Sequence, residues 1–301
     1  NAEKISCDLP SGFGLNGSFL PDHTITFHTE KFGMKKSNGE FHGELGKVTV
    51  VPLPWPESIM DSGPGDIHRY PNFDTASHKG NRGRVLIIGG GPYHGAPFLS
   101  GLAAARSGTD LVHVAIPKQS SSRVYWPLSL IPMQIDDEME FSQRGMAQIL
   151  KNLEKTSFNS IIVGPGMGKS SQTINALKFF LDEIRNYEIP LVIDGDGIEG
   201  LPKGHWPPEI SGVITPHRNE FSRWIDASWS SILDDLGNGD SSEDRVIVVT
   251  GPSDQIIGPN RRMCGALGGH PRMAVGGTGD LLSGLIGGLI SQGMTPWSSS
   301  R

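Results

Sequence analysis

Cysteine is scarce in this sequence. Only Cys7 and Cys264 occur among the 301 residues, so the chain cannot be built on the multiple disulfides that stabilise small secreted domains. So few cysteines are typical of proteins in a reducing compartment. No basic and apolar leader opens the sequence either, and we expect a cytoplasmic protein.

Long hydrophobic runs and an excess of positive charge are also lacking. The apolar run from Leu281 to Ile290 is about half the length that spans a bilayer, and glycines interrupt it, so we expect a buried helix there. The formal net charge of -6 gives no general attraction for nucleic acid or for an anionic membrane. A small molecule is therefore the expected partner, and a homo-oligomer remains possible.

Two regions with different patterns divide the chain. Residues 1–57 carry short strand-like pieces without an amphipathic helix, at Lys4 to Asp8, His23 to His28 and Lys47 to Pro52. Residues 58–80 are polar and rich in glycine, proline, aspartate and histidine, which is typical of a linker. We expect a small, partial β-rich segment at 1–57, a linker at 58–80 and the main domain at 81–301.

Strand and helix patterns alternate in the main domain. Strands are expected at Arg84 to Ile88, Leu111 to Ile116, Ser160 to Val163, Leu191 to Ile193, Gly212 to Thr215 and Arg245 to Val249, and helices at Ala96 to Ser107, Ser171 to Arg185 and Gly279 to Ile290. This alternation predicts an α/β fold, with a mostly parallel sheet covered by helices on both faces. Ligands of such sheets bind beyond the carboxyl ends of the strands, so the loops after strands should hold the functional residues.

Two glycine-rich loops follow strands. The first has glycines at 89–91, but a dinucleotide-binding G-x-G-x-x-G match would need glycine where His94 stands, and a tight turn is the simpler interpretation. The second loop, Val163 to Ser170, has the lysine and serine of a P-loop. It lacks the first glycine, and Pro165 removes one amide donor. A P-loop stays open as an alternative there, although it would leave the segment near the end unexplained.

The segment Gly276-Gly277-Thr278-Gly279-Asp280 is the candidate catalytic centre. Small residues let the amides at the start of a helix point into one concavity, where the helix dipole favours an anion such as a transferring phosphoryl group. Asp280 beside that anion could take a proton from a substrate hydroxyl. Capping of the helix is the alternative role for this carboxylate, but capping does not require four small neighbours.

Polar residues also follow two of the expected inner strands. In the segment TPHRNEF at 215–221, Pro216 fixes the turn, so that His217 and Glu220 would face the cleft. Asp194 and Asp196 follow another strand. A metal-binding or polar role competes there with simple turn formation.

In this order, the segments resemble the carboxyl-terminal domain of NAD(P)H-hydrate repair proteins, which is similar to ribokinase-like kinases. The resemblance begins near residue 79 and includes the first glycine loop, GPGMG at 164–168, the aspartates at 194 and 196, TPHRNEF at 215–221 and GGTGDLLSG at 276–284. It implies a ribokinase-like fold and a metabolite-repair lyase. Such an enzyme dehydrates the S form of 6-hydroxylated NADH or NADPH at the expense of ADP or ATP, with Mg2+ on the phosphates.

The resemblance also implies roles for individual residues. The hydrated nicotinamide nucleotide would contact Ala96, Gly166, His217 and Asp280, with Asp280 as the base. The ADP or ATP would be bound by Thr250, Gly251, Pro252, Ser253 and Asp254 together with Gly276, Gly277, Thr278 and Gly279. No metal ligand is assigned.

The sequence departs from the family pattern at three places. Thr250-Gly251 stands where the family usually has Lys-Gly, which removes a charge that pairs with phosphate. Gly269-His270-Pro271 replaces the usual Gly-Asn-Pro. The family continues past the GTGD helix, so we expect packing helices beyond Arg301 to be missing.

Residues 1–57 resemble the last part of the epimerase domain that precedes the dehydratase in bifunctional proteins. Asp8-Leu9-Pro10-Ser11-Gly12 matches its Asp-x-Pro-Ser-Gly signature, and Thr24 to Phe27 with Lys31 and Gly33 match the strand and turn that follow. A few strands do not form the closed pocket that an epimerase needs, so we expect no epimerase activity.

Three functions remain open from the sequence. The first is the nucleotide-dependent dehydratase, the second a ribokinase-like kinase of a small alcohol such as a vitamin precursor, and the third a non-catalytic nucleotide-binding remnant. The glycine and aspartate anion site is common to the first two. The TPHRNEF segment favours the dehydratase, and Thr250 favours the remnant.

Overall fold

The computed structural model describes residues 2–27, 30–31, 33–36, 39–53, 61–71, 76, 78, 80–225, 229–236, 244–259, 262–266 and 268–301. The chain forms two compact units, Asn1–Ile59 and Met60–Arg301. His28, the expected end of the second strand, lies outside the described residues, as does much of the expected linker.

The first unit is built on a small parallel sheet. Its strands are β1 (Ile5–Cys7), β2 (His23–Phe27) and β3 (Lys47–Val51), in the order β1-β2-β3. β2 lies in the middle, and its Thr24 hydroxyl donates to the carbonyl of Leu45 over 2.6 Å. Leu45 ends the short helix η1 (Gly43–Leu45) and is fully buried, whereas Val50 and Val51 on β3 remain exposed.

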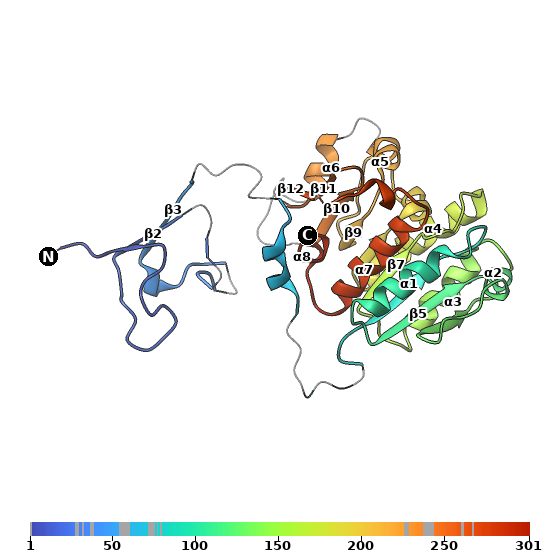
Figure 1. The fold of residues 1–301 in the computed structure, drawn as a ribbon, viewed down its shortest axis with the longest axis horizontal. Helices are drawn as coiled ribbons and strands as arrows, with labels where there is room; N and C mark the ends of the chain where they lie inside the picture. The colour runs from blue at the N-terminus through green and yellow to red at the C-terminus, as the bar shows by residue number, and fades with distance from the viewer. Residues whose placement is uncertain are drawn as a thin grey trace. The chain divides into compact units, whose positions relative to one another are not determined.

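The second unit has a central sheet of nine strands within the described residues, in the spatial order β12-β11-β10-β9-β8-β7-β4-β5-β6 (Figure 1). All neighbouring strands are parallel except at β11, which runs antiparallel to β10 and β12. The strands are β4 (Arg84–Ile88), β5 (Leu111–Ile116), β6 (Leu130–Gln134), β7 (Ser160–Val163), β8 (Leu191–Ile193), β9 (Gly212–Ile214), β10 (Arg245–Val249), β11 (Asp254–Ile257) and β12 (Met263–Ala266). The predicted α/β fold is confirmed.

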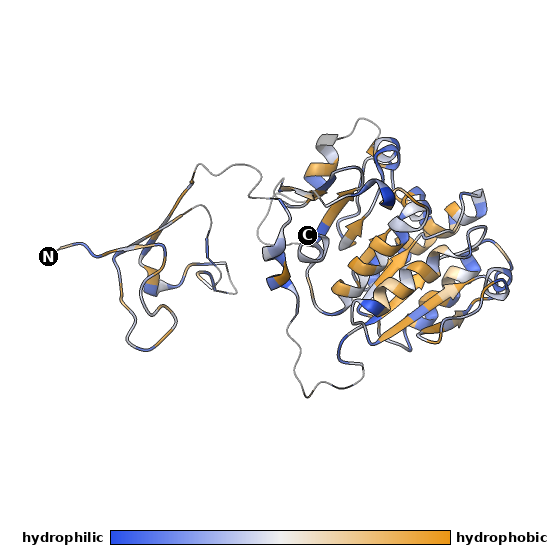
Figure 2. Cartoon of the chain, in the orientation of Figure 1, coloured by the Kyte–Doolittle hydropathy of each residue, from blue (hydrophilic) through white to orange (hydrophobic). Residues whose placement is uncertain are grey.

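Helices cover both faces of this sheet. α1 (Ala96–Arg106) and α7 (Thr278–Ser291) lie side by side on one face (Figure 1), and hydrophobic residues are concentrated on these helices and on the strands (Figure 2). The remaining elements are α2 (Lys118–Ser122), α3 (Gln143–Leu153), α4 (Ser171–Glu183), α5 (Arg218–Ile225), α6 (Trp229–Asp235), α8 (Pro296–Ser300), η3 (Pro64–Arg69), η4 (Ile184–Asn186), η5 (Gly195–Gly200) and η7 (Pro271–Met273).

The side chains of each strand point alternately to the two faces of the sheet, and this divides the core into two layers. In β4, Leu86 and Ile88 join the cluster that includes Leu177 of α4, whereas Val85 and Ile87 join the cluster that includes Ile286 of α7. Successive side chains of a strand point to opposite faces, so a strand buried on both sides reads as one continuous apolar run. The predicted bounds of β4, β5, β7, β8 and β10 are confirmed, because each of these strands is such an apolar run.

Residues 61–70 differ from the expected linker, because they are part of the second unit and contact the rest of it. The amide of Ser62 donates to the carbonyl of Gly265 over 2.8 Å, and the Tyr70 hydroxyl donates to the carbonyl of Ser107 over 2.8 Å. Between them, Asp66 of η3 pairs with Arg301 at 3.1 Å. Among the described residues, no helix combines the length and hydrophobicity needed to cross a bilayer.

Candidate active site

The strand order reverses direction between β4 and β7. From β4 the chain proceeds outward through β5 and β6, and from β7 it proceeds in the opposite direction through β8, β9 and β10. In open α/β sheets, ligands bind beyond the carboxyl ends of the strands at such a reversal. The loops after β4 and β7 are the two glycine-rich loops of the sequence.

These two loops are in direct contact. The amide of Gly90 donates to the carbonyl of Pro165 over 2.8 Å. Gly166 has a φ of 67°, which favours glycine. A Cβ at Gly166 would collide with the carbonyl oxygen of Tyr93 and lie 2.9 Å from the Cβ of Ala96. Ala96 and Gly166, both predicted to contact substrate, are thus brought together beyond the carboxyl ends of β4 and β7.

Lys169 and Ser170 of the alternative P-loop already interact with other residues of the protein. The Nζ atom of Lys169 lies 2.8 Å from Oε1 of Glu199 and 3.8 Å from Oδ1 of Asp196. The Ser170 hydroxyl accepts from the amide of Thr173 over 3.2 Å and so caps α4. A P-loop would need both residues for phosphate and magnesium, so the structure does not support this alternative.

The start of α7 leaves the side chain of Asp280 available. Gly277 is the N-cap residue, with a φ of 96° and no side-chain cap. Within the described residues, the Asp280 carboxylate accepts no hydrogen bond, whereas its backbone carbonyl accepts from Ser100 Oγ at 2.8 Å and Ser283 Oγ at 3.0 Å. The capping role considered for Asp280 is therefore not observed, and these serines fix the backbone that carries a half-buried carboxylate.

Four carboxylates from different elements influence one another here. Asp194, which follows β8, is 7% exposed and accepts from the Thr215 hydroxyl over 2.8 Å. Burial, together with the charges of Asp280 and Glu220, raises the pKa of Asp194 to about 7, although the hydrogen bond from Thr215 opposes the shift. Burial and the charge of Asp196 likewise raise the pKa of Asp280. A raised pKa makes Asp280 a stronger base for a substrate hydroxyl.

His217 lies at the start of a helix rather than in the expected loop. Its Nδ1 atom accepts from the amides of Asn219 and Glu220, at 3.1 and 3.3 Å, and Glu220 accepts from the amide of His217 at 3.1 Å. This reciprocal pattern is a capping box, in which a glutamate three residues after the cap signals a helix start. That signal in TPHRNEF could have predicted α5. The Nε2 atom of His217 lies 3.4 Å from Oε1 of Glu220.

The predicted nucleotide residues 250–254 form the turn between β10 and β11 and the first residue of β11. Thr250 pairs with His217 in a parallel bridge, and its amide donates to the carbonyl of Pro216 over 2.9 Å. The amide of Gly251 donates to the Asp254 carboxylate over 2.8 Å. The turn therefore lies beside His217, with two of its amides already bonded within the protein.

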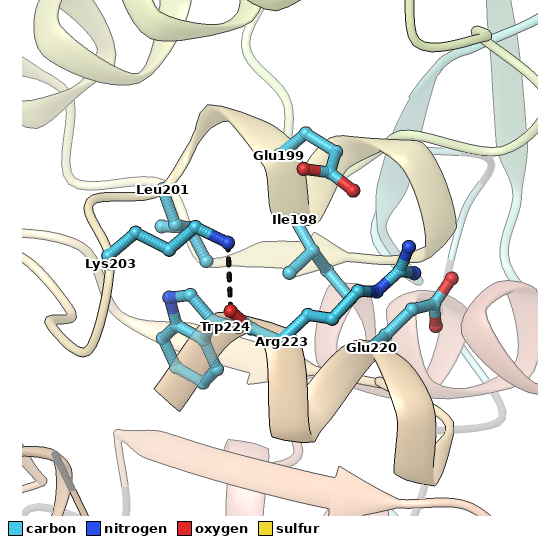
Figure 3. A pocket seen from close by; sticks show the side chains of 7 residues that line it. All are labelled: Ile198, Glu199, Leu201, Lys203, Glu220, Arg223 and Trp224. Atoms are coloured by element: carbon cyan, nitrogen blue, oxygen red, sulfur yellow. Dashed lines mark hydrogen bonds between the residues drawn. The ribbon is translucent and has the colours of Figure 1, made fainter. Parts of the chain in front are cut away.

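A pocket that the sequence did not indicate lies between η5 and α5 (Figure 3). Ile198, Leu201 and Trp224 form its apolar part, while Lys203 donates to the carbonyl of Arg223 over 2.8 Å. Glu220 also lines this pocket. The pocket and the carboxylate cluster therefore have Glu220 in common.

Comparison with known proteins identifies the family. The family model described as NAD(P)H-hydrate dehydratase matches residues 85–300. A bifunctional NAD(P)H-hydrate repair enzyme of Methanothermobacter thermautotrophicus is 32% identical over 99% of this chain and 59% of its own length. An ADP-dependent (S)-NAD(P)H-hydrate dehydratase of Cenarchaeum symbiosum is 31% identical over 79% of this chain and 83% of its own length.

Solved structures give the same fold. A ribokinase-like superfamily protein of Enterococcus faecalis has a TM-score of 0.63 and 24% identity, over 82% of this chain and 86% of its own. The ADP/ATP-dependent NAD(P)H-hydrate dehydratase of Bacillus subtilis, co-crystallised with ATP and Mg2+, has a TM-score of 0.59 and 22% identity, over 78% of this chain and 83% of its own. The ribokinase-like fold predicted from the sequence is confirmed.

The present chain spans about three fifths of the length of the bifunctional relatives, 59% in the first of them. The resemblance read from the sequence motifs is confirmed by both the family model and these relatives. The chain belongs to the NAD(P)H-hydrate dehydratase family.

Proposed function

We propose that the chain is a nucleotide-dependent lyase that converts the S form of hydrated NADH or NADPH back to the reduced cofactor. The position of Asp280 carries this proposal. Its carboxylate has no hydrogen-bond partner among the described residues and lies in the first turn of α7, where it interacts with the carboxylates of Asp194 and Asp196. The names of the relatives support the choice of a dehydratase over a kinase.

Asp280 is the proposed base. Hydroxide leaves poorly, so the substrate hydroxyl gives its proton to Asp280 as its oxygen attacks the terminal phosphorus of ADP or ATP, and the bond from that phosphorus to AMP or ADP breaks. The resulting phosphate ester then loses phosphate from one ring carbon and a proton from the neighbouring carbon, which restores the double bond of the dihydronicotinamide ring. Ala96, Gly166 and His217 hold the substrate in this proposal, because the first two lie together at the reversal of the strand order and the third lies beside Thr250.

The first turn of α7 and the turn at 250–254 are the proposed nucleotide site. The N–H groups of a first helical turn lack acceptors within the helix, and together with the helix dipole they attract anions. The described residues contain no group of three histidine, cysteine, aspartate or glutamate side chains arranged to hold a metal ion. In the proposal, Mg2+ would be held mainly by the nucleotide phosphates and water, where it would neutralise phosphate charge.

We further propose that the first unit is the last part of an epimerase-like domain, without epimerase activity of its own. The bifunctional relative of Methanothermobacter thermautotrophicus matches 99% of the chain, which includes this unit. Asp8 has a φ of 68°, and its carboxylate pairs with Lys31 at 3.0 Å. The proposed activity of the whole chain, which we place in the cytoplasm, therefore resides in the second unit.

The decisive experiment is to incubate the protein with hydrated NADH and Mg2+ and to follow the recovery of NADH absorbance. Parallel reactions contain ADP, ATP or no nucleotide. We expect recovery only with a nucleotide, because the proposed site needs a phosphoryl donor. Recovery without any nucleotide, or none with either, would contradict the proposed function.

A further inference from the structure

We propose that Arg218 binds the phosphate groups of the nucleotide, as the cation that the turn at 250–254 lacks. This inference rests on the proposed function and assigns a residue of its site. Arg218 is the first residue of α5. It directly follows His217, which pairs with Thr250.

The guanidinium of Arg218 lies against the turn. A Cβ added at Gly251 would be 3.1 Å from the Nε atom of Arg218 and 3.6 Å from its Cζ atom. The glycine therefore leaves space that the guanidinium borders. A ligand that reaches the turn meets this side chain.

Arg218 is also free to bind a ligand. Within the part of the chain that the structure describes, it is exposed, has no carboxylate within ion-pair distance and donates no side-chain hydrogen bond. By contrast, Lys169 is paired with Glu199, and Arg223, on the same helix, donates to the carbonyl of Asn219 over 3.3 Å. A guanidinium with all its donors available can bind a phosphate through two hydrogen bonds.

The surroundings require such a cation. The turn contains Asp254 and no basic residue, and the amides of Thr250 and Gly251 already donate within the protein. The neighbouring cluster adds further negative charge, from Asp280 and Glu220 among others. A nucleoside diphosphate carries several negative charges of its own, so its approach to this site would be opposed by repulsion without a nearby cation.

The test compares three variants of the full chain with the wild type. ADP, pyrophosphate and adenosine are each titrated by calorimetry into the wild type, Arg218→Gln, Arg218→Lys and Arg223→Gln. Arg223→Gln is the matched control, since it removes the same charge from the same exposed helix. We expect Arg218→Gln to weaken binding of ADP and pyrophosphate roughly tenfold, as for loss of a charge-assisted hydrogen bond, and to leave adenosine binding unchanged.

The controls separate a phosphate contact from a general effect. Arg218→Lys keeps the charge but loses the paired donors, so we expect a loss of only about threefold. Arg223→Gln should bind ADP within about twofold of the wild type, because a charge away from the ligand is largely screened. Equal losses for both glutamine variants, or equal losses for adenosine and ADP, would overturn the phosphate contact.

The outcome also separates this inference from the proposed function. If the wild type binds ADP and Arg218→Gln binds it equally well, the Arg218 contact is wrong and the proposed function stands. If the wild type binds neither ADP nor pyrophosphate, the Arg218 contact is wrong, and the proposed function is also wrong if neither ADP nor ATP supports the recovery of NADH.

Discussion

The two sides of the candidate site are constructed differently. On one side, the loops after β4 and β7 are held by backbone contacts, such as that between Gly90 and Pro165. On the other side, the ends of β8, α5 and α7 bring carboxylates together, of which Asp194 is almost fully buried. Shape therefore defines the first side, and charge defines the second. The first side, or glycine side, should tolerate changes of charge but not of size. The second side, or carboxylate side, should tolerate changes of size but not of charge.

The two sides meet where the loop after β7 passes the end of β8. Gly164 has a φ of 121°, and a Cβ there would collide with the carbonyl oxygen of Asp194. The amide of Asp194 in turn donates to the carbonyl of Val163 over 3.0 Å. The buried carboxylate is thus positioned by a glycine of the opposite side.

The largest expected effect is on the charged side. Asp280→Asn keeps the size of the side chain but removes the base, so turnover should fall roughly a hundred- to ten-thousand-fold. Unfolding should be little affected or shift to higher temperature, because a half-buried carboxylate with a raised pKa is removed. Rates of NADH recovery and thermal unfolding measure both effects. Asp182→Asn, on the exposed part of α4, is the control, and near-normal turnover of Asp280→Asn would contradict its role as base.

The second effect concerns the pH dependence of stability. The pKa of Asp194 is raised to about 7 from 3.8, so between these values the folded state holds a proton that the unfolded state has released. The stability that the protonated Asp194 contributes is therefore fully present below about pH 4. As the pH rises to about 7, this contribution to the free energy of unfolding falls by on the order of 4 kcal/mol. Asp280 and Glu220, the charged groups facing Asp194, contribute to this shift.

Asp194→Asn should remove this slope. Denaturant unfolding of both proteins at pH 4 to 8 gives the difference in their free energies of unfolding. Groups with lowered pKa values, such as Asp110 and Glu199, act in the opposite direction, but they are the same in both proteins and cancel. Parallel pH profiles would mean that Asp194 is ionised throughout and that burial does not hold its proton.

The fold and the separate parts of the site could largely be predicted from the sequence, whereas their assembly could not. Doubly buried strands such as β4 read as continuous apolar runs with clear ends. By contrast, β6 contains Pro132 and lies at the sheet edge, which weakens its strand signal. α3 was missed although Met146, Ile149, Leu150 and Leu153 follow helical spacing.

The sequence patterns did not predict the order of the strands in the sheet. The contact of Gly166 with Ala96 and the coupling of Asp194 to Asp280 both join segments far apart in the chain. Local periodicity carries no information on which strands become neighbours, since that depends on the packing of the whole sheet. The motifs predicted which residues to examine, and only the structure shows which of them meet.

The third effect tests the glycine side. Gly164→Ala places a Cβ against the Asp194 carbonyl at a positive φ, and we expect a loss of roughly 2 to 3 kcal/mol in the free energy of unfolding. Gly95→Ala is the matched control, because it lies in the other loop with a φ of -77° and open space around its Cβ. Denaturant titration measures both. Equal costs for the two variants would mean that close approach does not define this side.

The smallest expected effect is on the affinity of the carboxylate side for the nucleotide. Thr250→Lys adds a charge to the turn, beside His217, and should tighten ADP binding by about 1 kcal/mol for a partly exposed charge-assisted contact.

The size of this gain should depend on whether residue 218 is arginine or glutamine, because Arg218 already borders Gly251. Thr250→Lys should therefore improve binding more in Arg218→Gln than in the wild type, because neighbouring groups that contact one ligand are not additive. Calorimetric titration of the four proteins of this double-mutant cycle measures the coupling. Equal gains in both backgrounds would show that the two cations act independently, and no gain in either would place the phosphates away from residues 250–254.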